Sequence, residues 1–377
     1  MKKNYFRKVF AAAASILMVA SLASCGEKAE PMVSDENKAV TTAAVEETEA
    51  PVIQTEEVQT EEEQIDPTTL AHNPLTGEYG YNADALGKRP VAVMINNIDL
   101  SLPQYGIGSA DYIYEVVVEG GITRLMAVFA DYSNVPTLCS IRSCRYYYPL
   151  IANGLDAIYC HWGMNMTIAK ETLERLDIDR FDGDDSAYYD GLFYNDSERL
   201  EYYSREHTGC LDGSRLSEYI DNFGFRKESK KGSEDMMKFA EGAEMIDISD
   251  VSCGKVDVEF SESYFSTFTY DETDKKYYKC HSGDPHMDAA TGEQLSFTNV
   301  FALQTGVRTM EDGYLMEVDL TGGTGYYLSG GKIQEINWSK ASDYDNFVFT
   351  DKSGNPLTVN RGKCYIGITD SVTPYYD

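Results

Sequence analysis

Hydrophobic and polar residues follow one another along this chain in short runs that predict strands. Residues 89–97 are a continuous apolar run that ends in Asn96 and Asn97. This pattern predicts a buried strand with polar residues at its carboxyl end. Residues 112–118 and 122–130 predict two more strands, and the Gly120-Gly121 pair between them indicates a hairpin or a kink beside a ligand. A fourth strand is expected at residues 157–161, ending at His161.

Helical spacing of apolar residues is limited to a few short segments. Residues 168–176 and 214–223 each repeat apolar residues on one helical face. We also expect a helix over residues 142–150, cut at Pro149, and a short helix or linker over residues 227–241. Helices are therefore a minor part of the predicted structure.

The last third of the chain is β-structure by pattern. Strands are expected at residues 256–260, 264–270, 275–278, 299–303, 314–319, 325–328, 332–338, 347–350 and 364–368. Turn residues at this spacing predict a small barrel or sandwich. The fold class is therefore an α+β or α/β N-terminal domain at 67–235, followed by a mostly β C-terminal domain at 245–377.

The first residues have the pattern of an export signal. A basic start is followed by an apolar run from Val9 to Leu22 and then by Cys25. The run is shorter than the roughly 20 residues that a bilayer-spanning helix needs, so we interpret 1–24 as a signal peptide. The cleavage site resembles that of bacterial lipoproteins, in which the cysteine carries the lipid; the alternative is an ordinary secretory signal with an incidental cysteine.

The segment 25–66 is rich in acidic residues and lacks aromatic ones, so we expect a disordered stalk after the lipidated Cys25. The whole chain has a formal net charge of −30, which argues against nucleic acid as a partner. Contact with the membrane is expected through the lipid on Cys25 alone. The expected location is the extracytoplasmic face of the cell membrane.

Seven cysteines remain after Cys25, and an odd number cannot all pair. Disulfides are allowed in an exported protein, yet no CxxC motif is present, so a zinc ribbon or a redox site is not indicated. Free buried thiols explain the cysteines equally well. The sequence leaves their pairing open.

Several long motifs resemble one family. They are His72-Asn73-Pro74-Leu75-Thr76-Gly77, Arg89 to Asn97, Ala110 to Glu115, Val118 to Phe129, Ile141 to Arg145, Gly322 to Gly325 and Asn360 to Lys363. On these motifs the chain is identified as a member of the DUF3048 family. The resemblance implies a Gram-positive cell-surface lipoprotein with N-terminal and C-terminal family domains, and no established activity. Where the family has Pro-His-Asn, this chain has Glu206-His207-Thr208.

The candidate binding and catalytic residues lie in the first predicted domain. The residues are Glu115, Glu119, Arg124, Arg142, Arg145, His161 and His207. Arg142 and Arg145 are three residues apart and would share a helix face, from which two guanidinium groups could hold a carboxylate or phosphate. The structural alternative is that Glu115 or Glu119 forms a buried ion pair with an arginine.

Two other motifs give weaker evidence for a functional site. Cys280 and His281 would point to opposite faces of a strand, so a zinc site with His286 and Asp288 is not favoured. An acidic stretch at 182–185 lacks the final glutamate of an EF-hand. We predict no metal and no cofactor.

We therefore expect a non-enzymatic surface protein that binds a cell-envelope ligand or a protein partner. Ligand contacts are assigned to Glu115, Glu119, Arg124, Arg142, Arg145 and His161. The alternative is a cell-wall hydrolase or transferase. It would use Glu119 or Glu115 with His161 or His207, while Arg142 and Arg145 hold an anionic substrate.

Overall fold

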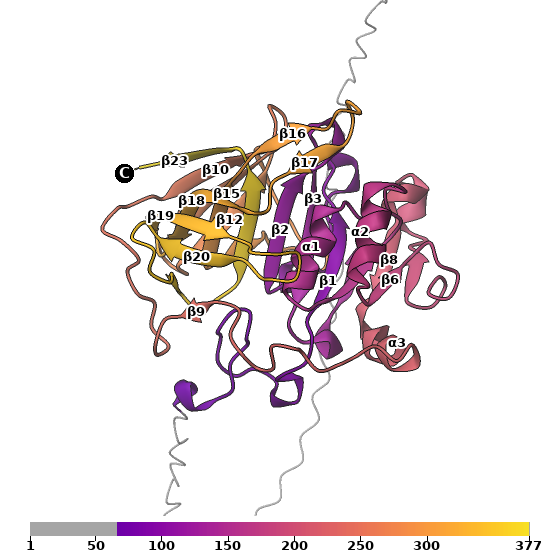
Figure 1. The fold of residues 1–377 in the computed structure, drawn as a ribbon, viewed down its shortest axis with the longest axis horizontal. Helices are drawn as coiled ribbons and strands as arrows, with labels where there is room; N and C mark the ends of the chain where they lie inside the picture. Colours follow the sequence, from indigo (N-terminus) through magenta and orange to yellow (C-terminus); the bar gives the residue numbers. More distant parts are fainter. Residues whose placement is uncertain (1–65, 377) are drawn as a thin grey trace, which may run out of the picture. The chain divides into compact units, whose positions relative to one another are not determined.

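The computed structural model describes residues 66–376 (Figure 1). The predicted signal peptide, Cys25 and the acidic stalk up to residue 65 lie outside the described residues. Within residues 66–376, no helix is both long enough and apolar enough to cross a membrane.

A ten-stranded mixed sheet forms the centre of the fold, and both sequence regions supply its strands. In order, they are β20 (Val348–Asp351), β19 (Lys332–Ser339), β18 (Gly322–Ser329), β15 (Asn299–Gln304), β22 (Cys364–Thr369), β2 (Tyr112–Val117), β3 (Thr123–Phe129), β1 (Val91–Asn96), β5 (Ile158–His161) and β6 (Arg180–Asp182). Strand β22, near the end of the chain, is parallel to both β15 and β2. This single strand joins the two regions into one sheet.

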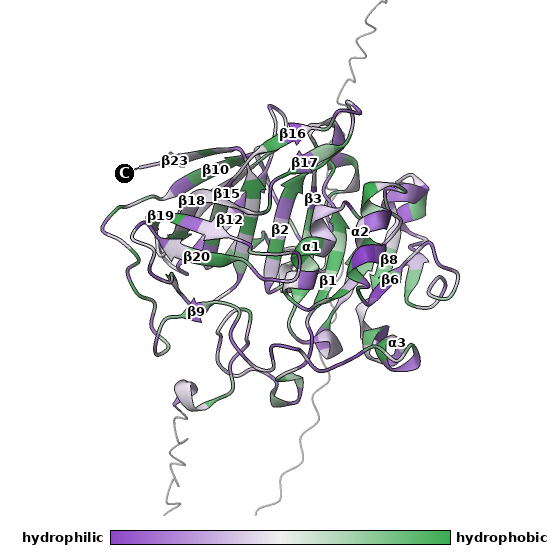
Figure 2. Cartoon of the chain, in the orientation of Figure 1, coloured by the Kyte–Doolittle hydropathy of each residue, from purple (hydrophilic) through white to green (hydrophobic). Residues whose placement is uncertain are grey.

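The middle strands of the sheet are buried on both faces. Every residue of β1, β2, β3 and β22 is buried, which explains their mostly apolar sequences (Figure 2). One face packs against α1 (Tyr147–Gly154) and α2 (Ile168–Leu176). These helices lie in front of the sheet in Figure 1.

The opposite face packs against a second, six-stranded sheet. Its strands are β13 (Asp284–Pro285), β12 (Lys276–His281), β11 (Phe265–Asp271), β10 (Lys255–Glu259) and β23 (Ser371–Tyr375), with β14 (Ser296–Phe297) beside β12. Val256, Val258 and Phe268 of this sheet share a core with Ile113 and Tyr365 of the large sheet. The C-terminal region is thus mostly β, as the sequence predicts.

Smaller elements complete the fold. They are the three-stranded sheet of β4 (Thr137–Cys139), β8 (Gly209–Asp212) and β7 (Phe193–Asn195), helix α3 (Leu216–Asn222), the pair β16 (Val307–Thr309) and β17 (Met316–Val318), and the pair β9 (Lys238–Phe239) and β21 (Thr358–Val359). A disulfide between Cys139 and Cys210 joins β4 to β8, where the two residues are register partners. Cys144, Cys160, Cys280 and Cys364 are free thiols.

One expectation about helices needs correction. The helix expected at 142–150 begins only at Tyr147 and continues to Gly154, because the backbone before it pairs with strands instead. Pro149 lies in the first turn of α1, where the missing N–H has no intrahelical partner to lose. Residues 227–241 contain turns and β9 but no helix, so this segment is a linker.

A buried polar network crosses the space between the two sheets, with Glu115 of β2 at its centre. One carboxylate oxygen accepts hydrogen bonds from Asn97 at 3.0 Å and from Thr123 at 2.8 Å. The other accepts from Ser266 and from Tyr365, each at 2.8 Å. Glu115 is 1% exposed, so these four donors replace the water that the carboxylate loses on folding.

Lys279 of β12 supplies the counter-charge, and its Nζ lies 3.4 Å from Oε2 of Glu115. The same Nζ lies 2.9 Å from Nδ1 of His286, whose Nε2 lies 2.7 Å from Oε1 of Gln104. Gln104 in turn donates to Asn97 at 3.0 Å, and Asn97 donates to Glu115. The network is therefore a closed ring in which a neutral His286 accepts from the Lys279 ammonium.

Burial alone would raise the pKa of Glu115, but Lys279, His281 and the hydrogen bonds from Ser266 and Thr123 together hold it below its usual value. Burial is also the main reason that the pKa of His286 lies well below normal, and the nearby positive charge of Lys279 adds to it. The ring therefore holds an ionised carboxylate and an uncharged imidazole.

Replacing Lys279 with Met should destabilise the protein by about 3–5 kcal/mol, because the Glu115 carboxylate is then buried without a counter-charge. Urea unfolding measures the change. The double variant Glu115→Gln/Lys279→Met should lose far less than the sum of the single variants. Lys352→Met, which breaks only an exposed pair with Glu335, is the matched control and should leave the unfolding midpoint unchanged. Additive losses in the double variant would contradict the pairing.

The free energy of unfolding should fall as the pH is lowered from about 6.5. His286 and Glu115 both have folded-state pKa values below their unfolded values, so the unfolded chain binds more protons, and their stabilisation is lost as pH falls. Each such proton contributes up to about 1.4 kcal/mol per pH unit. Urea unfolding at several pH values should show a shallower fall for His286→Gln than for the wild type. A stability that rises on acidification would contradict this assignment.

Candidate functional site

The segment before α1 is wedged between two parallel strands of the large sheet. Strands β1 and β5 pair only over Val91–Val93 and Ile158–Cys160. Beyond that point, the Arg142 N–H donates to Met94 O at 3.0 Å, and the Arg142 carbonyl accepts from the Trp162 N–H at 3.1 Å. The prediction that Arg142 and Arg145 share a helix face is therefore wrong. The backbone of this segment is extended and places both residues at the carboxyl ends of β1 and β5.

Arg145 forms a buried ion pair with Glu119, the residue that opens the turn between β2 and β3. The Arg145 Nε donates to Glu119 Oε1 at 2.5 Å, and the two side chains are 15% and 7% exposed. Burial would lower the pKa of Arg145, but the bond to Glu119 raises it above its usual value. Glu119 thus forms a buried ion pair with an arginine, which was the structural alternative to a ligand contact.

Arg124 lies beside this pair on β3. Its guanidinium donates to Ser143 O at 2.7 Å. Burial, followed by repulsion from the positive charge of Arg145, lowers the pKa of Arg124 to about 10. Three predicted ligand contacts, Arg124, Arg145 and Glu119, are therefore brought together.

Arg142 points to a second group that includes His207. Its guanidinium donates to the Glu206 carboxylate at 2.7 Å and to the Glu206 carbonyl at 3.2 Å. The His207 ring lies 3.0 Å from Asn96 Nδ2, at the end of β1. Burial lowers the pKa of His207, and Arg142 and Arg199 lower it further, although Glu206 opposes them. His207 is therefore an uncharged ring at neutral pH.

His161, at the end of β5, is completely buried. Its Nδ1 lies 2.9 Å from Gly163 O and 3.6 Å from Asp182 Oδ1. Its Nε2 has no hydrogen-bond partner among residues 66–376. Burial lowers the pKa of His161 despite the opposing charge of Asp182. The ring is thus held by its Nδ1 side alone.

Glu115 is separated from the arginines by the sheet itself. It faces the second sheet and belongs to the ring with Lys279 described above. Arg124 and Glu119 take part in contacts at the carboxyl edge, with Arg145 and Ser143. The predicted site residues therefore divide into one buried structural carboxylate and an edge cluster.

Of the predicted site residues, Arg142 lines an open cleft of about 440 Å³ in the described part of the chain, whereas Glu119, Arg124, Arg145, His161 and His207 are not among its lining residues. Its lining includes Arg142, Trp162, Asp184, Arg205 and Glu206. Arg205 donates to the Tyr189 hydroxyl at 2.9 Å, and Trp162 donates to Asp184 at 2.9 Å. The cleft thus combines two guanidinium groups with an aromatic wall and two carboxylates, a set that can orient a charged ligand.

The sequence analysis did not select Trp162 or Arg205, and it considered Asp184 only as part of an acidic stretch that resembles a calcium loop. Trp162 is adjacent to the predicted strand end at His161, so its position was a usable signal. Arg205 and Glu206 precede His207, where the chain departs from the family pattern. That departure therefore falls on the lining of the cleft.

The chain matches two protein-family models. Residues 75–226 match the "Protein of unknown function (DUF3048) N-terminal domain", and residues 256–366 match the corresponding C-terminal domain. The chain is 26% identical over 287 residues to the "Putative lipoprotein YerB" of Bacillus subtilis (strain 168), which covers 74% of this chain and 81% of that protein.

A solved structure shows the same fold. The crystal structure of YerB protein from Bacillus subtilis matches with a TM-score of 0.69 at 24% identity, over 81% of this chain and 99% of that chain. Both parts of the family pattern are present in order along the sequence. The chain therefore belongs to the DUF3048 family of proteins of unknown function.

Proposed function

We propose that this protein is anchored by a lipid on Cys25 to the extracytoplasmic face of the cell membrane, where it binds an anionic cell-envelope ligand. The similarity to a putative lipoprotein and the cysteine that directly follows the predicted signal at 1–24 support the anchor. On this proposal, residues 25–66 are a stalk, and the ligand site belongs to the domain at 67–235.

The cleft beside Arg142 is the observation that carries the binding role. Arg142 and Arg205 line it from two different segments, so an anionic group between them would receive charge-assisted hydrogen bonds from both sides. Arg142 is only 23% exposed in its side chain, which reduces screening by water. Glu206 holds Arg142 in place until the ligand anion competes for it.

Binding is favoured over the hydrolase alternative because of the state of Glu119. A general base needs a carboxylate that can reach a substrate proton, whereas Glu119 is buried against Arg145. Arg145 and Arg124 act in this proposal as a fixed positive background behind the cleft. A protein partner that presents an acidic side chain would use the same two arginines.

The double variant Arg142→Ala/Arg205→Ala should bind purified peptidoglycan sacculi, with their anionic polymers attached, at least about a hundredfold more weakly than the wild type. The reason is that charge-assisted hydrogen bonds contribute roughly 1.5–3 kcal/mol each. Co-sedimentation measures the affinity. Arg215→Ala removes an exposed arginine paired with Glu218 and is the matched control. Equal binding by all three proteins would overturn the proposal, and so would release of soluble fragments that Glu119→Gln abolishes.

Labelling of cells with radioactive palmitate should mark the wild-type protein but not Cys25→Ala, because the thiol of Cys25 is the proposed site of acylation. Cys280→Ala is the control, since Cys280 is a partly exposed free thiol in the folded part of the chain. The control should label like the wild type. Label retained by Cys25→Ala would contradict the anchor.

A further inference from the structure

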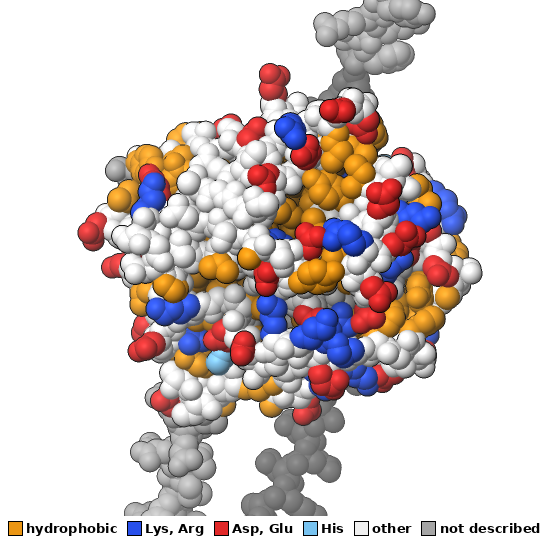
Figure 3. All heavy atoms as spheres, in the orientation of Figure 1, with side chains coloured by type: hydrophobic (Ala, Val, Ile, Leu, Met, Phe, Trp, Pro, Cys, Tyr) orange, Lys and Arg blue, Asp and Glu red, His pale blue; other side chains and the backbone are white. Residues whose placement is uncertain are grey.

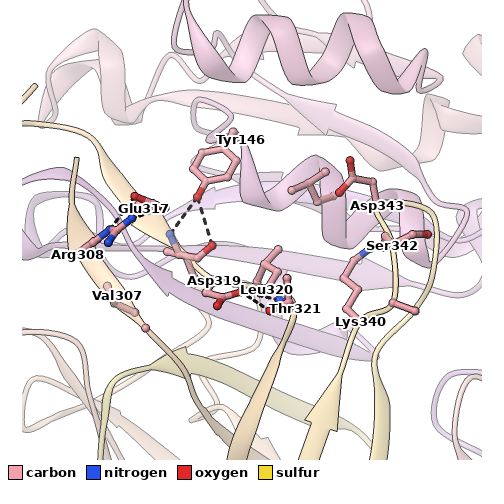
Figure 4. Close-up of a pocket in the computed structure, with 14 residues that line it drawn as sticks. Tyr146, Val307, Arg308, Glu317, Asp319, Leu320, Thr321, Lys340, Ser342 and Asp343 are labelled. Atoms are coloured by element: carbon pink, nitrogen blue, oxygen red, sulfur yellow. Dashed lines mark hydrogen bonds and ion pairs between the residues drawn. The ribbon is translucent and has the colours of Figure 1, made fainter. Parts of the chain in front are cut away.

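A groove of about 700 Å³ lies between the start of α1 and the C-terminal region of the chain (Figure 4). This volume is within the range of small-molecule sites, about 300–1,000 Å³. It shares no lining residue with the cleft beside Arg142. The groove is therefore a separate candidate site.

Both sequence regions build the groove. The Tyr146 hydroxyl donates to Val318 O at 3.3 Å and accepts from Val318 N at 3.0 Å, which fixes α1 against β17. Leu150 and Leu320 are 9% and 8% exposed and form apolar wall, together with the half-buried Val307. Hydrophobic side chains also gather beside β16 and β17 on the face shown in Figure 3.

Most charged groups in the groove already have partners. Arg308 forms two hydrogen bonds with Glu317, at 2.8 and 2.9 Å. Asp343 pairs with Arg175. Asp319 accepts from the backbone and the side chain of Thr321, at 2.8 and 2.6 Å. These groups are satisfied without a ligand.

Lys340 differs from them. The residue is 6% exposed, and its ammonium donates to Ser342 O at 2.5 Å. An ammonium has three donors, and within residues 66–376 no carboxylate forms an ion pair with this one. Burial lowers the pKa of Lys340, and the more distant Asp343 and Asp345 offset this only in part, against a further lowering by Lys231. A buried charge with spare donors is costly unless an anion completes it.

We propose that this groove binds an amphiphile, with a carboxylate or phosphate head on Lys340 and an apolar chain along Tyr146, Leu150 and Leu320. The head would accept the free ammonium donors. The chain would lie against the apolar wall that these side chains form in the groove. This inference does not depend on the proposed role of the Arg142 cleft.

Calorimetric titration with dodecanoate, below its micelle concentration, tests the head and the chain separately. We expect one bound dodecanoate per protein and at least tenfold weaker binding of dodecanol, which has the chain without the charge. Lys340→Met should lose this preference, while Lys352→Met, which removes an exposed lysine, should keep it. Equal affinity for dodecanoate and dodecanol in the wild type, or an unchanged preference in Lys340→Met, would overturn the proposal.

A second variant keeps the test valid if Lys340→Met does not fold. Val307→Glu retains Lys340 but adds a negative charge to a half-buried wall position, so dodecanoate should bind at least tenfold more weakly. Wild-type affinity in Val307→Glu would count against the site. Dodecyl phosphate and phosphatidylglycerol vesicles then separate the sources. Binding of the monomer alone supports a free amphiphile, vesicle binding that the monomer displaces supports a membrane lipid, and binding of neither phosphate nor carboxylate overturns the proposal.

Discussion

The buried ion pair between Glu115 and Lys279 is the constraint on which the rest of the structure depends. The two residues come from different sheets and from the two family-matched regions of the chain. Neither charge tolerates burial alone, so the second sheet must sit on β2 in one register for both to be satisfied. The ring through His286, Gln104 and Asn97 extends this requirement to the loop that follows β1. The pair therefore specifies how the two regions fit together, whatever it adds to stability.

The large sheet positions the residues that line the cleft and the groove. Because β22 lies between β15 and β2 and is parallel to both, these strands from the two regions end at the same edge of one sheet. At the carboxyl edge, the segment around Arg142 lies between β1 and β5 and brings Arg142 to the cleft. Ligand sites commonly lie where neighbouring parallel strands separate in this way. Tyr146, directly before α1, forms hydrogen bonds with Val318 of β17 and so shapes the groove beside Lys340.

Local patterns predicted the strands well, because burial on one or both faces leaves a direct record in the order of apolar residues. Strands β1, β2, β3 and β5 and helix α2 lie where the sequence indicates. The pairing of β22 with β2 could not be predicted, since it joins residues about 250 positions apart and depends on no local signal. The helix expected at residue 142 failed for a related reason, because hydrogen bonds to distant strands override local propensity.

The placement of the candidate residues followed only partly from the sequence. Arg142 and Arg145 were selected for a helix face that does not form, and Glu119 and Arg124 for their place beside Gly120-Gly121, yet the fold brings all four to one edge. Lys279 was missed although it alternates with Tyr277 and His281, all three of which are buried. That alternation placed a lysine on the inward face of β12 and was the available signal. Trp162 and Arg205 needed the course of the loops, which local pattern does not give.

The chain offers a direct test of the claim that both regions form one cooperative unit. Its two tryptophans, Trp162 and Trp338, lie in different regions, so Trp162→Phe and Trp338→Phe each leave one fluorescent reporter. Urea unfolding followed by tryptophan fluorescence should give each variant a single transition that coincides with its own circular dichroism transition. One region unfolding at a clearly lower urea concentration than the other would contradict the account.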